Sequence, residues 1–149
     1  MNLSKNFTYE ELTHSEIAER KGWDNTPPPS AYENLVRLAN LLEQVRFLLG
    51  KPLIINSAYR SKLVNDSVGS KDTSQHRLGC AADIKVGGMT PDEVVRTIKY
   101  SDIQFDQLIR EFDNGNGSGW THISVPNNPN ETPRKQSLII DKQGTRQYI

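Results

Sequence analysis

The chain has 149 residues, of which 35% are hydrophobic, and its 18 basic side chains balance 18 acidic ones. This length suits one domain with its own core, the balanced charge argues against binding driven by nucleic-acid phosphates, and no apolar run approaches the ~18 residues of a membrane span. The first residues lack the apolar stretch of a secretory signal, so we expect synthesis in the cytoplasm. The single cysteine, Cys80, cannot form an internal disulfide, and we expect it to be a small buried residue.

Residues 1–29 are predicted to form a helical lead-in to a core of residues 30–149, within a single domain. Two capping-box patterns, Thr8–Glu11 and Thr13–Glu16, indicate short helices, and Gly22 suits a helix stop.

The longest helix is predicted to follow the three prolines at positions 27–29. A third capping box, Ser30–Glu33, precedes apolar residues at helical spacing, and Gly50 with Pro52 ends the pattern. A helix of about 18–20 residues with one apolar stripe is expected to pack across a sheet.

Segments of strand composition alternate with polar loops through the rest of the chain. The predicted strands are Leu53–Asn56, Cys80–Val86, Phe105–Glu111, Trp120–Val125 and Ser137–Asp141. A helix is predicted to begin after Thr90, and the glycine-rich loop Asp113–Gly119 is typical of a hairpin connection. We therefore expect an α+β fold with a central antiparallel sheet and helices packed on it.

Three residues form a candidate metal site. His76 and Asp83 lie in one short segment, and His122 lies on a later strand. Two imidazoles and one carboxylate are a standard ligand set for catalytic zinc, with one coordination position left open for water. Asp83 lies in an apolar strand, where an unpaired carboxylate would be costly, so a metal is the interpretation we favour and a structural salt bridge is the alternative.

A hydrolase built on such a site also needs a carboxylate that is not a ligand. Glu111 is the best candidate, because antiparallel pairing across the loop would bring it near His122. Asp113 and Asp106 are alternatives for the base, and Glu111 could instead be an exposed charge at a strand end.

Four residues are candidates for substrate contacts. The planar fork of Arg60 suits a carboxylate, although a residue just past a strand can equally lie on the surface. Ser74 or Gln75 could orient the substrate or a metal ligand, and Trp120 could form a pocket wall or belong to the core.

Three sequence blocks resemble the M15 family of zinc D-Ala-D-Ala carboxypeptidases and their phage relatives, the L-alanyl-D-glutamate endolysins. The family pattern Ser-x-His-x-x-Gly-x-Ala-x-Asp is matched from Ser74 to Asp83. An upstream Ser-Gly-Tyr-Arg-Ser is matched at residues 57–61 with Ala58 in place of glycine, and a downstream Trp-Val-His-Ile-Ser is matched at residues 120–124. The order and spacing of the blocks also fit.

The resemblance implies a fold like that of Hedgehog and DD-peptidase domains, and a peptidase with one zinc ion on His76, Asp83 and His122 that cuts peptidoglycan peptides. It further implies a substrate carboxylate held by Arg60. Some members carry an acidic base three residues before the last histidine, where this chain has Gly119, so Glu111 fits the branch whose base ends the preceding strand.

The sequence leaves two further interpretations open. The first is a non-catalytic, metal-stabilised module that binds cell wall or builds a virion. The second is a non-haem iron oxygenase, because the same ligands suit Fe(II), although the flanking blocks argue against it. If the chain is a peptidase, we expect a monomer that acts on the cell wall, in the host periplasm if a phage encodes it, without a nucleic-acid partner.

Overall fold

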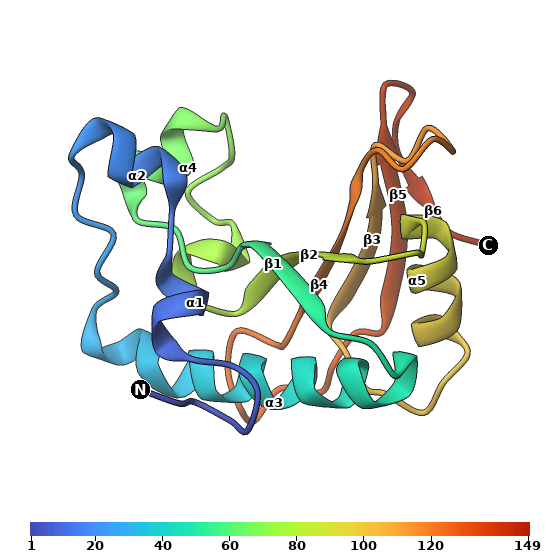
Figure 1. Cartoon of the computed structure of the whole chain (residues 1–149), viewed down its shortest axis with the longest axis horizontal. Coiled ribbons are helices and arrows are strands. Elements are labelled where there is room, and N and C mark those ends of the chain that lie inside the picture. The colour runs from blue at the N-terminus through green and yellow to red at the C-terminus, as the bar shows by residue number, and fades with distance from the viewer.

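A six-stranded sheet lies at the centre of the protein, and its longest helix runs along one face (Figure 1). The computed structural model describes residues 1–149 and confirms the expected α+β fold. The helices are α1 Tyr9–Thr13, α2 Glu16–Lys21, α3 Tyr32–Leu49, α4 Lys62–Ser67 and α5 Pro91–Lys99, with 3-10 turns η1 Pro29–Ala31 and η2 Gln75–Leu78. The strands are β1 Leu53–Ser57, β2 Ala81–Val86, β3 Gln107–Glu111, β4 Trp120–Ser124, β5 Gln136–Asp141 and β6 Gly144–Gln147.

The sheet has the order β1-β2-β4-β3-β5-β6 and is mixed, which corrects the expectation of a purely antiparallel sheet. Every neighbouring pair is antiparallel except β3 and β5, which run parallel. The reason lies in the connection after β4, which returns past the start of β3. There Lys135 donates its backbone N–H to the Phe105 carbonyl and Gln136 donates to that of Asp106, so β5 starts where β3 starts.

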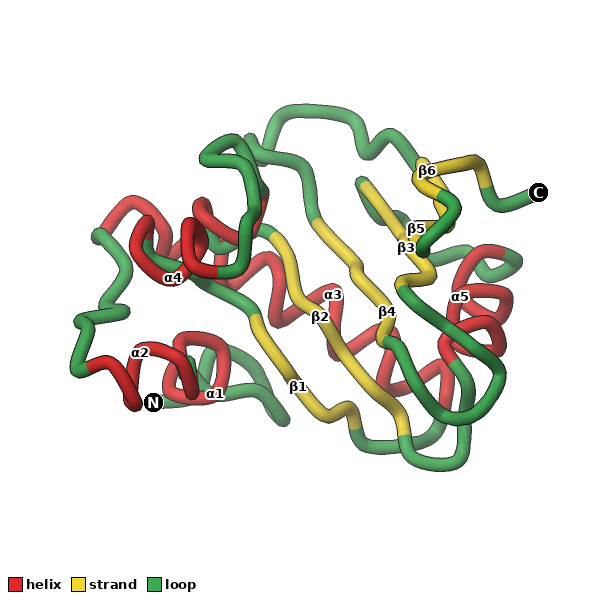
Figure 2. The backbone as a smooth tube through the Cα atoms, turned by 90° about the horizontal axis from the view of Figure 1, so that it is seen from above, coloured by secondary structure: helices red, strands yellow, loops and turns green.

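Helix α3 covers the inner face of the sheet, as its apolar stripe predicts (Figure 2). The fully buried side chains of Leu35, Leu38, Leu42 and Val45 lie along that stripe. Burying each such side chain contributes about 1.5–3 kcal/mol. The predicted capping box at its start is wrong, because η1 leads directly into α3 and Ala31 is the N-cap, without a side-chain cap.

The lead-in helices begin and end largely as the sequence indicates. Thr8 caps α1 and Gly22 ends α2 in the left-handed conformation, but Ser15 rather than Thr13 caps α2. The capping box of Thr90 and Glu93 on α5 is complete. None of the helices combines the length and the apolar character that a membrane crossing requires.

The two faces of the sheet differ in chemistry because side chains alternate along each strand. Ile84, Leu108 and Ile123 are fully buried on the face toward α3 and α5. Asp83 precedes Ile84 and so lies on the opposite face, where it pairs in register with His122. Cys80 is fully buried in the core, as predicted.

Candidate metal centre

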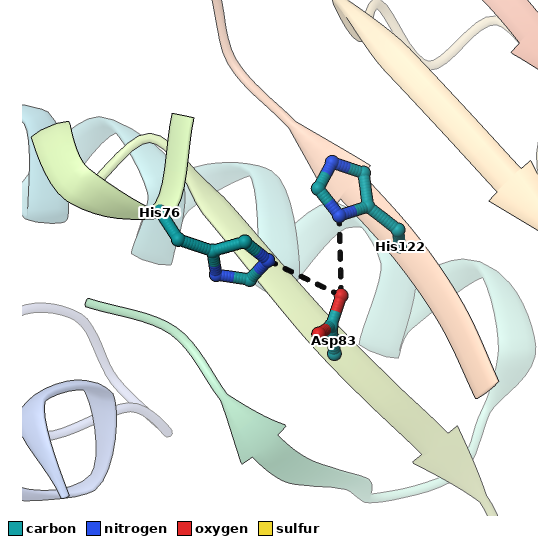
Figure 3. A group of neighbouring side chains, drawn as sticks. All are labelled: His76, Asp83 and His122. Atoms are coloured by element: carbon teal, nitrogen blue, oxygen red, sulfur yellow. Dashed lines mark hydrogen bonds and ion pairs between the residues drawn. The ribbon is translucent and has the colours of Figure 1, made fainter. Parts of the chain in front are cut away.

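Three side chains meet on the outer face of the sheet: His76 from η2, Asp83 from β2 and His122 from β4 (Figure 3). Their potential ligand atoms all lie within 4.8 Å of one another. Asp83 Oδ1 is 3.3 Å from His76 Nε2 and 3.1 Å from His122 Nδ1. All three residues are buried, so the structure brings together the three ligands that the sequence predicts.

Local backbone contacts place His76 at this cluster. The hydroxyl of Ser74 caps η2 by accepting a hydrogen bond from the His76 N–H at 3.2 Å. Gly79 ends η2 in the left-handed region with φ 79°, and a Cβ there would lie 3.1 Å from Leu35 Cγ in the core. Ser74 and Gly79 therefore fix the ligand-bearing turn at both ends.

The protonation of His76 tests whether a cation fits the cluster. Its Nδ1 is 2.7 Å from the carbonyl oxygen of Ala58, which can only accept, so Nδ1 carries the proton. Burial lowers the pKa of His76, which keeps the ring neutral and leaves a lone pair on Nε2. That lone pair faces the carboxylate of Asp83. Two acceptors in this arrangement repel each other unless a cation lies between them, so the donor set fits a metal ion.

Arg60 holds the second oxygen of Asp83. Its NH2 donates to Asp83 Oδ2 at 3.0 Å, and its other nitrogens donate to Ser57 and Asn65. Burial alone would raise the pKa of Asp83, but its contacts with His122 and Arg60 hold it well below its usual range, so the carboxylate is ionised. The substrate-clamp role of Arg60 stays a prediction, and its contact with a metal ligand is a feature that the sequence did not indicate.

Glu111 lies beside the cluster, with its Oε2 3.9 Å from His122 Nδ1. It pairs in register with Trp120, so its side chain lies on the same sheet face as the metal ligands. Burial raises the pKa of Glu111, and the negative charge of Asp83 adds to the effect. A carboxyl group with a raised pKa is suited to receive a proton and to release it again.

The two alternative bases are engaged elsewhere. Asp113 accepts the backbone N–H of Asp92 at 3.0 Å, at the start of α5. Asp106 is buried and accepts hydrogen bonds from Nε and NH2 of the Arg134 guanidinium group. Neither contacts the metal cluster, so Glu111 is the carboxylate that the structure brings to it.

Gln75 points away from the cluster that its neighbour His76 joins. Its amide nitrogen lies 2.9–3.1 Å from three acceptors, which share its two N–H groups: Asp106, the carbonyl of Val125 and Asn127. Gln75 therefore ties η2 to the connection between β4 and β5, and its expected substrate contact stays a prediction.

Trp120 is half-buried beside Glu111, and its ring lies 5.5 Å from that of Phe112 at an interplanar angle of 32°. Sequence reasoning missed Phe112, which follows Glu111 with an unusual φ of 53°. The only signal was an aromatic residue directly before a glycine-rich loop. Sequence reasoning also missed Asn65, whose side-chain oxygen accepts a hydrogen bond from Arg60, because it belongs to no recognisable motif.

The family model described as Peptidase M15 matches residues 5–124, which is more than half of the chain. The protein therefore belongs to the peptidase M15 family, which supports a metallopeptidase, and its His-Asp-His cluster is a candidate metal site. The match spans all the candidate ligands and Glu111, and it ends at Ser124, before β5 begins. No curated protein sequence matches the chain.

Proposed function

We propose that this protein is a zinc-dependent peptidase that hydrolyses the stem peptides of peptidoglycan, either as a D-Ala-D-Ala carboxypeptidase or as an L-Ala-D-Glu endopeptidase. The observation that carries the proposal is the meeting of His76 Nε2, Asp83 Oδ1 and His122 Nδ1, with Glu111 next to them. The resemblance to wall-active members of the M15 family supports the choice of substrate.

His76, Asp83 and His122 would hold one zinc ion, which would supply a water of lowered pKa and a Lewis acid for the scissile carbonyl. Glu111 accepts the proton of the attacking water at its carboxylate and gives it to the nitrogen of the leaving amine. Its burial keeps bulk water from competing for that proton, and its raised pKa makes the carboxylate a stronger base for the first of the two transfers. Asp83 stays ionised throughout because the Arg60 guanidinium donates a hydrogen bond to its second oxygen.

Arg60 has five N–H donors, of which three are engaged within the protein. We propose that the remaining donors bind a carboxylate of the substrate. The half-buried ring of Trp120 would form a wall of the same site, while Ser74 acts through His76.

Mass spectrometry of purified muropeptides tests the proposal. The protein is incubated as purified, after chelation, and after zinc is restored, with Glu111→Gln as the matched inactive variant. We expect hydrolysis only with metal and with Glu111 intact. Loss of a terminal alanine identifies a carboxypeptidase, and a cut between the first alanine and the glutamate identifies an endopeptidase that acts in the cell wall. A zinc-loaded protein that yields no product would support the non-catalytic module.

Metal analysis of the same preparations separates zinc from iron. We expect one zinc per chain and turnover that does not depend on oxygen. Stoichiometric iron with oxygen-dependent turnover would contradict the peptidase.

A further inference from the structure

At Gly119, just before β4, the backbone lies so close to the backbone at the end of β3 that a side chain would not fit between them. Gly119 has φ 85°, and a Cβ built on it would collide with the carbonyl oxygen of Glu111 and lie 2.7 Å from the carbonyl carbon and oxygen of Phe112. Cβ atoms essentially never lie within 3.0 Å of another heavy atom in this way. Position 119 therefore requires glycine for two reasons, its backbone conformation and the close approach of Glu111 and Phe112.

Phe112 is in the left-handed region, with φ 53°, directly after the candidate base. This conformation is unfavourable for an aromatic residue and persists only where neighbours enforce it. The Phe112 N–H donates to the Ile140 carbonyl at 2.9 Å, and the Ser118 hydroxyl donates to the Phe112 carbonyl at 3.3 Å. Its ring packs against Trp120, so backbone and side chain are both held.

We propose that Phe112 and Gly119 form a junction that positions Glu111 for the reaction. The left-handed turn at Phe112 ends β3 immediately after Glu111, and the missing side chain at Gly119 lets the Glu111 carbonyl lie against β4. Together they fix the backbone from which the Glu111 carboxylate reaches toward His122. Neither residue contacts the metal cluster, so both act through Glu111 as positioning residues. The inference rests on the proposed function, in which Glu111 is the base.

One contact of the junction comes from β5, which follows the region matched by the peptidase M15 model. The junction therefore joins the matched part of the chain to the strand beyond it.

Gly119→Ala and Gly117→Ala form a matched pair that tests the junction. Gly117 lies in the same loop with φ 86°, and a Cβ there would meet nothing within 4 Å. Both variants place a side chain on a residue with nearly the same positive φ, but only Gly119→Ala adds the collision with Glu111 and Phe112. The carbonyl of Gly117, which accepts from Lys85, is retained in its variant.

We expect both variants to keep wild-type zinc content. With purified muropeptides as substrate, Gly117→Ala should keep wild-type kinetics. Gly119→Ala should lose about tenfold to hundredfold in kcat with little change in KM, because a displaced base fails in the reaction step rather than in binding. Crystal structures of the two variants give an independent reading. The distance from Glu111 Oε2 to His122 Nδ1 should lengthen in Gly119→Ala alone.

A second pair covers the case in which Gly119→Ala does not fold. Phe112→Ala removes the contact with the Trp120 ring and should lower kcat while zinc stays bound, whereas Phe112→Tyr keeps the ring and should restore turnover. Equal kcat in Phe112→Ala and Phe112→Tyr would overturn the inference.

These experiments distinguish an error in the proposed junction from an error in the proposed function. If Glu111→Gln abolishes turnover while Gly119→Ala matches Gly117→Ala in kcat, the base is right and the junction is wrong. If Glu111→Gln keeps wild-type turnover, or the wild type cleaves no muropeptide, the proposed function is wrong. The variant structures then still decide whether Gly119 positions the side chain of Glu111, and an unmoved Glu111 would overturn the inference.

Discussion

Asp83 and His122 face each other across β2 and β4, with Oδ1 3.1 Å from Nδ1 and their Cα atoms in register. Two neighbouring strands therefore supply two ligands of the metal centre without any loop in between. Because ligands on strands are positioned by the hydrogen bonds of the sheet, this half of the site should be rigid before the metal binds. His76 reaches the site from a 3-10 turn, whose geometry depends on its caps.

Removal of either imidazole should abolish metal binding and hydrolysis together. We expect His76→Ala and His122→Ala to lose most bound zinc, because two remaining ligands rarely hold the ion. His14→Ala is the matched control, since His14 is exposed at the end of α1 and should leave zinc content unchanged. Stoichiometric zinc in His76→Ala or His122→Ala, measured by elemental analysis, would refute the ligand assignment.

Turnover should depend on the ionised form of Glu111. Burial, and then the charge of Asp83, raise the pKa of Glu111, so activity should be lost as the pH falls through a value above that of an ordinary glutamate. The pH profile of kcat/KM measures that acidic limb. Glu111→Gln should keep zinc and lose about 100-fold or more in kcat. Asp113→Asn is the control, and a loss as large as that of Glu111→Gln would move the base to Asp113.

Arg60→Ala should have two separable effects. Loss of the hydrogen bond from Arg60 to Asp83 should weaken zinc affinity by about 10-fold to 100-fold, which is the usual effect of removing a hydrogen-bond partner of a metal ligand. Loss of a substrate clamp should raise KM when zinc is saturating. Zinc titration and steady-state kinetics at saturating zinc measure the two effects independently. Unchanged KM under those conditions would leave Arg60 with the Asp83 contact alone.

Asp106 should make stability depend on pH. Burial would raise the pKa of Asp106, but hydrogen bonds and charge from Arg134 lower it, so the folded state holds this carboxylate ionised. Its stabilisation is present above the pKa of an unfolded aspartate and is lost as the pH falls through the lower folded value. Asp106→Asn should cost about 2 kcal/mol at neutral pH, because Gln75 and Arg134 lose an acceptor.

Chemical denaturation of wild type and Asp106→Asn across this pH range checks the prediction. The difference in the free energy of unfolding should shrink as the pH falls. A difference that is constant with pH would mean that Arg134 gains nothing from the charge of Asp106.

The sequence predicted that His76, Asp83 and His122 would form one cluster because two histidines and an acid are a zinc ligand set and the three sequence blocks resemble the M15 family, and the structure brings these residues together. It placed Glu111 near His122 by antiparallel pairing across the hairpin loop, which the structure confirms, while the role of Glu111 as base stays a prediction. The parallel placement of β5 could not be predicted, because it depends on a long connection whose path is set by contacts such as Lys135 with Phe105. The direction in which the Gln75 side chain points could not be predicted from the sequence either, because adjacent side chains on a 3-10 turn point toward different neighbours.

The close approach at Gly119 illustrates what composition alone leaves out. A glycine in a glycine-rich loop looks interchangeable with the others, and only the position of the Glu111 carbonyl separates it from Gly117.

The parallel pairing of β3 with β5 has a consequence for the order in which the protein becomes active during synthesis. All three metal ligands have been synthesised by residue 122, whereas the strand that holds Phe112 through Ile140 is synthesised later. A nascent or truncated chain that ends before residue 136 would contain every metal ligand but lack the support behind Glu111. Synthesis would thus complete the metal-binding residues first and the support for proton transfer last.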